Sequence, residues 1–136
     1  VHMASTGEWN GERNLLDRVT PCLPDSRVRD RLEVIRTQGR DFSLPETADR
    51  WGASGYVVES VPLALCGAER VLSVGFESTL EELVRCGGDT DTVASLTGQV
   101  AGAFLGAAAL PADLMARLVD YDLIHGDAID LARVLG

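Results

Sequence analysis

The segment Gly87-Gly88-Asp89-Thr90-Asp91-Thr92 opens the most apolar part of the chain, residues 93–110. Glycines recur in that segment every four residues, at Gly98, Gly102 and Gly106. In an α-helix this spacing places them on one face, where a second helix can approach closely. Each glycine costs about 1 kcal/mol of helix propensity relative to alanine, so the spacing favours a packing role. We therefore expect a central helix over about residues 90–108.

Apolar residues at helical spacing predict further helices on both sides of this segment. The expected ranges are about 10–20, 26–38, 56–70, 76–86, 111–119 and 122–135. Residues 56–65 contain three valines and are also compatible with a strand. We prefer a helix there, because Val57, Val61 and Ala64 share one helical face.

Two further expectations complete the fold. Residues 40–54 show no period and contain Pro45 and Gly52, which indicates a loop that crosses the surface. The last helix is expected to bury its aliphatic residues, Ile124, Ile129, Leu131 and Leu135. Since strands and helices do not alternate along the chain, we predict an all-α fold, a compact helical bundle that forms one domain.

Composition argues against several classes of function. The chain has 136 residues, a length that suits a single domain, and a net charge of -9 from 12 basic and 21 acidic residues. The basic residues form no stripe, which argues against a nucleic-acid partner or an anionic membrane surface. The longest apolar run is shorter than the roughly 20 residues that a membrane-spanning helix needs. We interpret Val1-His2-Met3 as a cloning scar.

The three cysteines, Cys22, Cys66 and Cys86, include no Cys-x-x-Cys pair. Their number and spacing therefore suggest neither a disulfide framework nor a zinc site, and a reducing, cytoplasmic setting is expected. Cys66 and Cys86 lie among apolar residues, so we interpret them as core thiols.

Asp89 and Asp91 place two carboxylates at the start of an apolar helix, where a cationic partner would offset their cost. Carboxylate and hydroxyl oxygens are hard ligands that suit magnesium or manganese, and Thr92 adds a hydroxyl. In the alternative interpretation, the two acids cap the helix and meet its N-terminal dipole, a contribution of about 1 kcal/mol.

Several motifs in a fixed order give the chain a family resemblance. They are Gly55-Tyr56-Val57-Val58-Glu59, the Gly-Gly-Asp-x-Asp-Thr element at 87–92, the small-residue run 98–106 and Leu110-Pro111. From about Trp51 to Leu135 the chain resembles the C-terminal half of the ADP-ribosylglycohydrolase family, which includes the dinitrogenase-reductase-activating glycohydrolases. The resemblance implies an all-helical enzyme that uses Mg²⁺ or Mn²⁺ to hydrolyse the bond between ADP-ribose and an acceptor.

The resemblance also implies roles for individual residues. Asp89, Asp91 and Thr92 match metal ligands of the family, and Tyr56 matches a tyrosine that lines the ADP-ribose pocket. Gly87 and Gly88 would contribute to substrate binding. The alternative for Tyr56 is an ordinary packing residue. Glu59, on an apolar helix, is expected to pair with an arginine or to face a cavity.

The sequence departs from the family in its first part. Family members carry a Gly-Asp-containing motif and a Thr-Asp-Asp motif in a first half, and neither is matched here. The resemblance divides the chain into residues 4–50, N-terminal helices and a loop, and residues 51–136, the family-like helical region.

Two functional hypotheses follow. The first is metal-dependent hydrolysis of an ADP-ribosyl N- or O-glycosidic bond in an ADP-ribosylated protein or an ADP-ribosyl small molecule. On this hypothesis the site is incomplete without a complementary N-terminal half or a homo-oligomer. The alternative is a non-catalytic helical fragment, derived from that family, that self-associates through its apolar surface.

Overall fold

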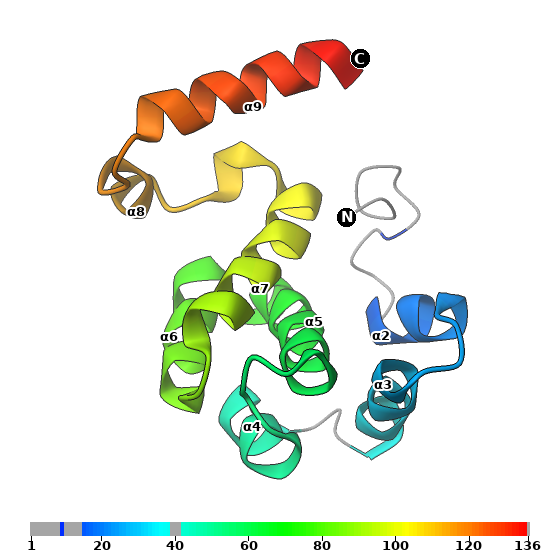
Figure 1. The fold of residues 1–136 in the computed structure, drawn as a ribbon. Coiled ribbons are helices and arrows are strands. Elements are labelled where there is room, and N and C mark those ends of the chain that lie inside the picture. Colours follow the sequence, from blue (N-terminus) through cyan, green and yellow to red (C-terminus); the bar gives the residue numbers. More distant parts are fainter. Residues whose placement is uncertain (1–8, 10–14, 39–41, 136) are drawn as a thin grey trace.

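In the computed structural model, the described part of the chain comprises residue 9, residues 15–38 and residues 42–135. Its elements are α2 (Leu15–Val19), the 3-10 turn η1 (Thr20–Cys22), α3 (Arg27–Gln38), α4 (Leu44–Trp51), α5 (Val57–Val74), α6 (Phe76–Cys86), α7 (Thr90–Leu105), the 3-10 turn η2 (Ala107–Ala109), α8 (Ala112–Ala116) and α9 (Tyr121–Leu135) (Figure 1). No strand occurs in these ranges, which confirms the all-α prediction.

Helix α5 is the element around which the others pack, with contacts to α2, α3, α4, α6 and α7. The segment that was compatible with a strand is therefore a helix of 18 residues. Pro62 lies inside it and is buried, although proline removes one backbone hydrogen bond of the helix. The helix ends at Gly75, whose φ of 89° is favourable only for glycine.

Three apolar clusters form the core, and each has α5 on one side. One cluster joins α4, α5, α6 and α7 through Leu44, Ala48, Leu63, Ala64, Leu83 and Val93. The second contains Trp9, Leu15 and Ala68, and the third contains Leu16, Leu32 and Ile35. On α3, Leu32 and Ile35 are both buried, so this helix turns an apolar face toward the core.

The closest helix contact does not involve the regularly spaced glycines of α7. A Cβ atom on Gly67 of α5 would lie 2.7 Å from Thr97 Oγ1 of α7, whereas a Cβ on Gly102 would meet nothing within 4 Å. The buried Thr97 hydroxyl donates a hydrogen bond to the carbonyl oxygen of Ala64, at 3.2 Å. The prediction of a glycine-faced central helix was therefore wrong in detail, since the glycine at the contact belongs to α5.

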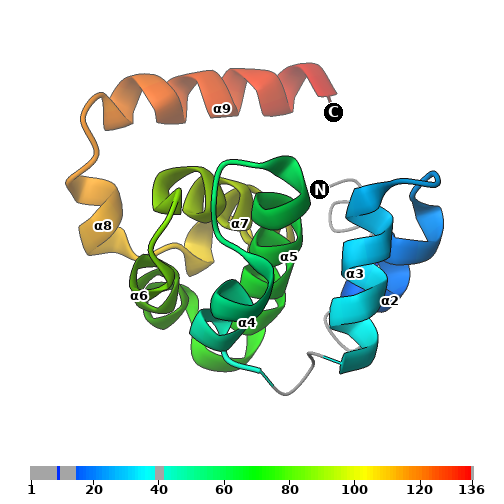
Figure 2. The same ribbon diagram turned by 60° about the horizontal axis from the view of Figure 1, so that its bottom comes forward.

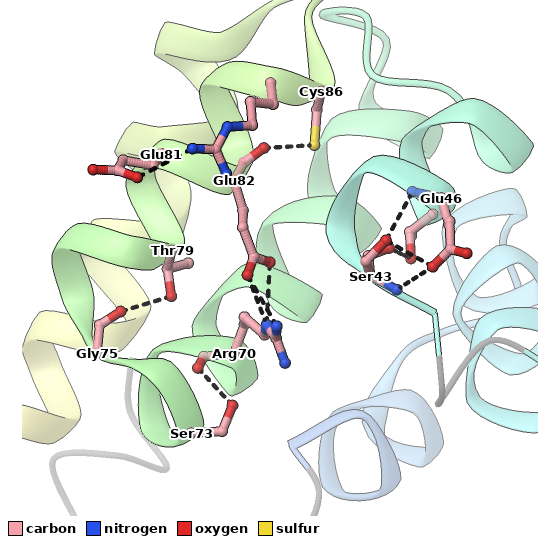
Figure 3. A network of polar contacts seen from close by, with 11 residues as sticks. Ser43, Glu46, Arg70, Ser73, Gly75, Thr79, Glu81, Glu82 and Cys86 are labelled. Carbon is pink, nitrogen blue, oxygen red and sulfur yellow. Dashed lines mark hydrogen bonds and ion pairs between the residues drawn. The ribbon is translucent and has the colours of Figure 1, made fainter.

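The loop predicted for residues 40–54 contains a helix instead. α4 begins after Ser43, whose hydroxyl accepts from the Glu46 amide, while the Glu46 carboxylate accepts from the Ser43 amide at 2.8 Å (Figure 3). This reciprocal capping box and the adjacent Pro45 are local signals for a helix start. A helical period is present, since Leu44, Ala48 and Trp51 share one face, and the prediction failed because Pro45 and Gly52 are also typical of a loop.

The C-terminal helices do not bury the residues expected of them. Ile124, Ile129 and Leu131 are exposed, and the side chain of Leu135 lies outside the described residues. Both ribbon views place α9 at the edge of the molecule, away from α5 (Figures 1 and 2). None of the helices in the described ranges is both long enough and apolar enough to cross a membrane.

Candidate functional site

The turn between α6 and α7 meets the loop that precedes α5. The Asp89 amide donates to the carbonyl oxygen of Ala53 at 2.8 Å. A Cβ on Gly88 would lie 2.2 Å from that same oxygen, and Gly88 has a φ of 69°. Only glycine fits there, so the position predicted to bind substrate has a clear structural role. Gly87, with a φ of 66°, likewise turns the chain out of α6.

The side chains of Asp89 and Asp91 are brought together at the start of α7. Hydrogen bonding with the Asp89 side chain is the largest cause that lowers the pKa of Asp91, followed by the amides of Thr92 and of Asp91 itself. Asp91 is therefore favoured as a carboxylate. Asp89 occupies the N-cap position, yet its side chain caps no amide. The interpretation that these acids cap the helix thus agrees with the amide contacts of Asp91. It does not explain the position of the Asp89 carboxyl.

Asp89 also lies against the loop before α5. A Cβ on Gly55 would be only 2.4 Å from Asp89 Oδ2, so the absent side chain at residue 55 makes room for the carboxyl. This contact places Gly55, the residue before Tyr56, beside the Asp89 carboxyl. Two separated motifs, Gly55-Tyr56 and Asp89-Thr90-Asp91, therefore meet where Gly55 contacts Asp89.

The donor chemistry of the acid pair matches magnesium or manganese. Asp89 and Asp91 offer hard carboxylate oxygens, and Thr92, in the same helical turn, is exposed with a hydroxyl. Across the described residues, no group of three or more His, Cys, Asp or Glu side chains could hold a metal ion. The donors that these residues could offer to a metal ion are thus two carboxyl groups and one hydroxyl, and such an ion would need water to complete its coordination shell.

Tyr56 presents its ring at the surface. Its side chain is 45% exposed, and it precedes α5 in an extended conformation without capping the helix through its side chain. The Arg27 guanidinium of α3 lies over the ring, with Cζ 5.8 Å from the ring centroid. Sequence reasoning did not identify Arg27, because nothing local to residues 27 and 56 indicates that they meet.

Glu59 holds the loop in front of α5. Its Oε2 accepts from the Ser54 hydroxyl at 2.6 Å and from the Ser54 amide at 3.1 Å. The Ser54 hydroxyl is the largest cause that lowers the pKa of Glu59, and Arg31 is a smaller one. Glu59 also fills the space that a Cβ on Gly52 would need. The main partner of Glu59 is therefore a serine, and its contacts are those of a loop anchor.

Comparisons with known proteins identify one family. The model of the ADP-ribosylglycohydrolase family matches residues 1–136. The match includes residues 4–50, so it extends beyond the range over which the motifs carry the resemblance. No curated protein and no solved structure matches the chain.

Proposed function

This chain belongs to the ADP-ribosylglycohydrolase family, and we propose that it hydrolyses an ADP-ribosyl N- or O-glycosidic bond with the help of Mg²⁺ or Mn²⁺. The observation that supports the proposal is that Asp89 lies against Gly55 and that its side chain interacts with that of Asp91. Water would add its oxygen to the anomeric carbon of the ribose, and a proton would pass to the acceptor as the glycosidic bond breaks.

Asp89, Asp91 and Thr92 are the residues that would hold the metal ion. A bound divalent ion supplies Lewis acidity toward water and toward sugar hydroxyls. The hydrogen bonds that lower the pKa of Asp91 favour its carboxylate form, which is the form that a metal ligand needs. The same negative charge would favour the positive charge that develops on the ribose as the bond breaks.

Tyr56 is the residue best placed to hold the substrate. Its exposed ring offers an apolar face on which a nucleoside can stack. Glu59 does not join it, because both hydrogen bonds that the carboxylate accepts from Ser54 keep it on the loop. We therefore assign Glu59 to positioning the loop that carries Gly55 and Tyr56.

The direct test is Mn²⁺-dependent release of ADP-ribose from ADP-ribosyl-arginine, ADP-ribosyl-serine and a free ADP-ribosyl compound. Asp91→Asn should abolish release of ADP-ribose, since it replaces a carboxylate ligand by a neutral amide of nearly the same size. Asp127→Asn is the matched control, because Asp127 is exposed on α9, and it should retain wild-type activity. Absence of release from every substrate at saturating Mn²⁺ would reject the proposal.

A second candidate function is supported by the exposed apolar residues of the C-terminal region. They are Leu118, Val119, Leu123, Ile124, Ile129, Leu131 and Val134. Exposed apolar residues on a helix can mark a surface that a partner covers, and a second copy of the same chain is the partner always present. On this candidate the chain is a non-catalytic helical protein that forms a homodimer through α9.

Light scattering after size-exclusion chromatography distinguishes this candidate. The double variant Leu123→Asp and Ile124→Asp should convert a dimer to a monomer, while Asp91→Asn should leave the dimer intact. A wild-type chain that is monodisperse and monomeric at high concentration would exclude self-association. Dimerisation and hydrolysis are measured separately, and hydrolysis by the wild-type chain would exclude the non-catalytic candidate even if the chain is a dimer.

A further inference from the structure

The loop between α4 and α5, residues 52–56, contacts Asp89 at two points. The carbonyl oxygen of Ala53 accepts a hydrogen bond from the Asp89 amide at 2.8 Å, and Gly55 lies against Asp89 Oδ2. Because both the backbone and the carboxyl of Asp89 touch the loop, the position of this carboxyl depends on the conformation of the loop. The side chains that hold the other side of the loop therefore influence the acid pair.

Arg31 of α3 fixes the residue from which the loop departs. Its Nη1 donates a hydrogen bond at 2.6 Å to the carbonyl oxygen of Trp51, the last residue of α4. The last carbonyl oxygens of a helix have no partner within that helix, and a positive charge is favourable at this end. Arg31 satisfies one of these oxygens from a different helix. It thus joins α3 to the beginning of the loop.

Glu59 holds the next part of the same loop from α5. Its carboxylate accepts two hydrogen bonds from Ser54 and occupies the space that a Cβ on Gly52 would need. The positive charge of Arg31 lies near enough to lower the pKa of Glu59, although the Ser54 hydroxyl lowers this pKa more. Arg31 therefore acts on the loop through the Trp51 carbonyl and through its attraction for Glu59.

We propose that Arg31 is a positioning residue for the metal ligand Asp89. By holding Trp51 and Glu59, it keeps the loop in the conformation in which Ala53 and Gly55 place the Asp89 carboxyl beside Asp91. This inference rests on the proposed function, which assigns a metal ion to the acid pair. It also gives α3, which precedes the range over which the motifs carry the family resemblance, a part in forming the site.

The experiment measures two quantities on the full chain without substrate: hydrogen exchange of the Asp89 amide without metal, and the affinity for Mn²⁺ by titration calorimetry. Arg31→Met keeps an unbranched side chain but removes the charge and the donor. It should accelerate exchange of the Asp89 amide about tenfold or more, because the loop that accepts its hydrogen bond opens more often. Mn²⁺ affinity should fall about tenfold, as it does when support around a metal ligand is lost.

Two internal controls separate positioning from general stability. The Thr79 amide donates to the Gly75 carbonyl oxygen at the start of α6, away from the loop, and its exchange should stay as in the wild type. Arg31→Lys should restore part of the Mn²⁺ affinity, since it supplies the charge and one donor without the planar fork. Loss of folding alone would accelerate exchange of both amides.

Two further variants test the route through Asp89. Arg29→Met is the matched control on the same helix, because Arg29 pairs with the exposed Asp25, and it should behave as the wild type does. In an Asp89→Asn background, Arg31→Met should cause no additional loss of Mn²⁺ affinity. Two changes that act through one group are not additive, whereas independent changes are.

The outcomes separate this inference from the proposed function. Unchanged Asp89 exchange in Arg31→Met, equal acceleration at Thr79, or unchanged Mn²⁺ affinity would each overturn the role of Arg31, even if the chain hydrolyses its substrate. A wild-type chain that binds no Mn²⁺ would overturn it too, and so would an additional loss of affinity in the Asp89→Asn background. If Mn²⁺ affinity depends on Arg31 but no ADP-ribosyl compound is hydrolysed, the positioning role stands and the hydrolase proposal fails.

Discussion

Gly55 and Asp89 are 34 positions apart in the sequence, yet a single Cβ atom on Gly55 would lie 2.4 Å from Asp89 Oδ2. The contact joins the Gly-Tyr motif before α5 to the acid pair that opens α7. Because the contacted atom is the end of a rotatable side chain, a substitution at Gly55 would turn the Asp89 carboxyl away rather than unfold the chain.

Gly55→Ala should therefore separate site geometry from stability. We expect Mn²⁺ affinity, followed by titration calorimetry, to fall about tenfold or more as Asp89 rotates away from Asp91. The melting temperature should change by no more than a few degrees. Gly102→Ala is the control, since a Cβ there meets nothing within 4 Å, and it should raise stability by up to about 1 kcal/mol. Unchanged Mn²⁺ affinity in Gly55→Ala would contradict the proposed role of Asp89.

Gly67→Ala tests the close approach of α5 and α7. The added Cβ would lie 2.7 Å from Thr97 Oγ1 and 3.1 Å from Thr97 Cγ2, and Thr97 is fully buried. Overpacking of this kind costs about 1–3 kcal/mol, which should exceed the gain in helix propensity. Urea unfolding measures the difference. Stabilisation by Gly67→Ala would show that the two helices separate without cost.

Ser43→Ala tests the capping box of α4 and its dependence on pH. Loss of the cap should cost about 1 kcal/mol at neutral pH. Hydrogen bonds from the Ser43 hydroxyl and amide lower the pKa of Glu46 in the folded chain. The stabilisation that follows from this lowered pKa is complete above the ordinary glutamate value of about 4.3 and is lost as the pH falls through the lowered value. The difference between wild type and variant should therefore narrow below about pH 4, measured by thermal unfolding across pH.

Thiol modification tests the burial of the cysteines. Burial is the main cause that raises the pKa of Cys66 to about 12 and that of Cys86 to about 11, whereas Cys22 is exposed. Since the thiolate is the reactive form, iodoacetamide at pH 8 should modify Cys22 first and Cys66 last. The Cys22→Ser variant should lack the fast phase, and all remaining thiols should react once the chain is denatured. Rapid modification of Cys66 in the folded chain would show that the core around α5 opens.

The sequence predicted helices where a local signal was strong. Local apolar spacing, together with residues that begin or end helices, predicts the helix that starts near Ser26 and the helix over Phe76–Cys86. The same spacing places Leu32 and Ile35 on one face, and both are buried. α4 was not predicted, although Ser43 and Glu46 form a capping signal and Leu44, Ala48 and Trp51 share one helical face. The residues proposed as metal ligands could be named from the sequence because the motif is contiguous.

What the sequence determined by itself is the all-α class, most helix positions and the acid pair at the start of α7, since these depend on residues within one or two helical turns of each other. The tertiary structure decided that Gly67 rather than Gly102 makes the close helix contact, that Ile124 and Leu131 stay exposed, and that Arg27 lies over Tyr56. The physical reason is that a helical period identifies which side chains share a face. It carries no information on which neighbour, if any, covers that face.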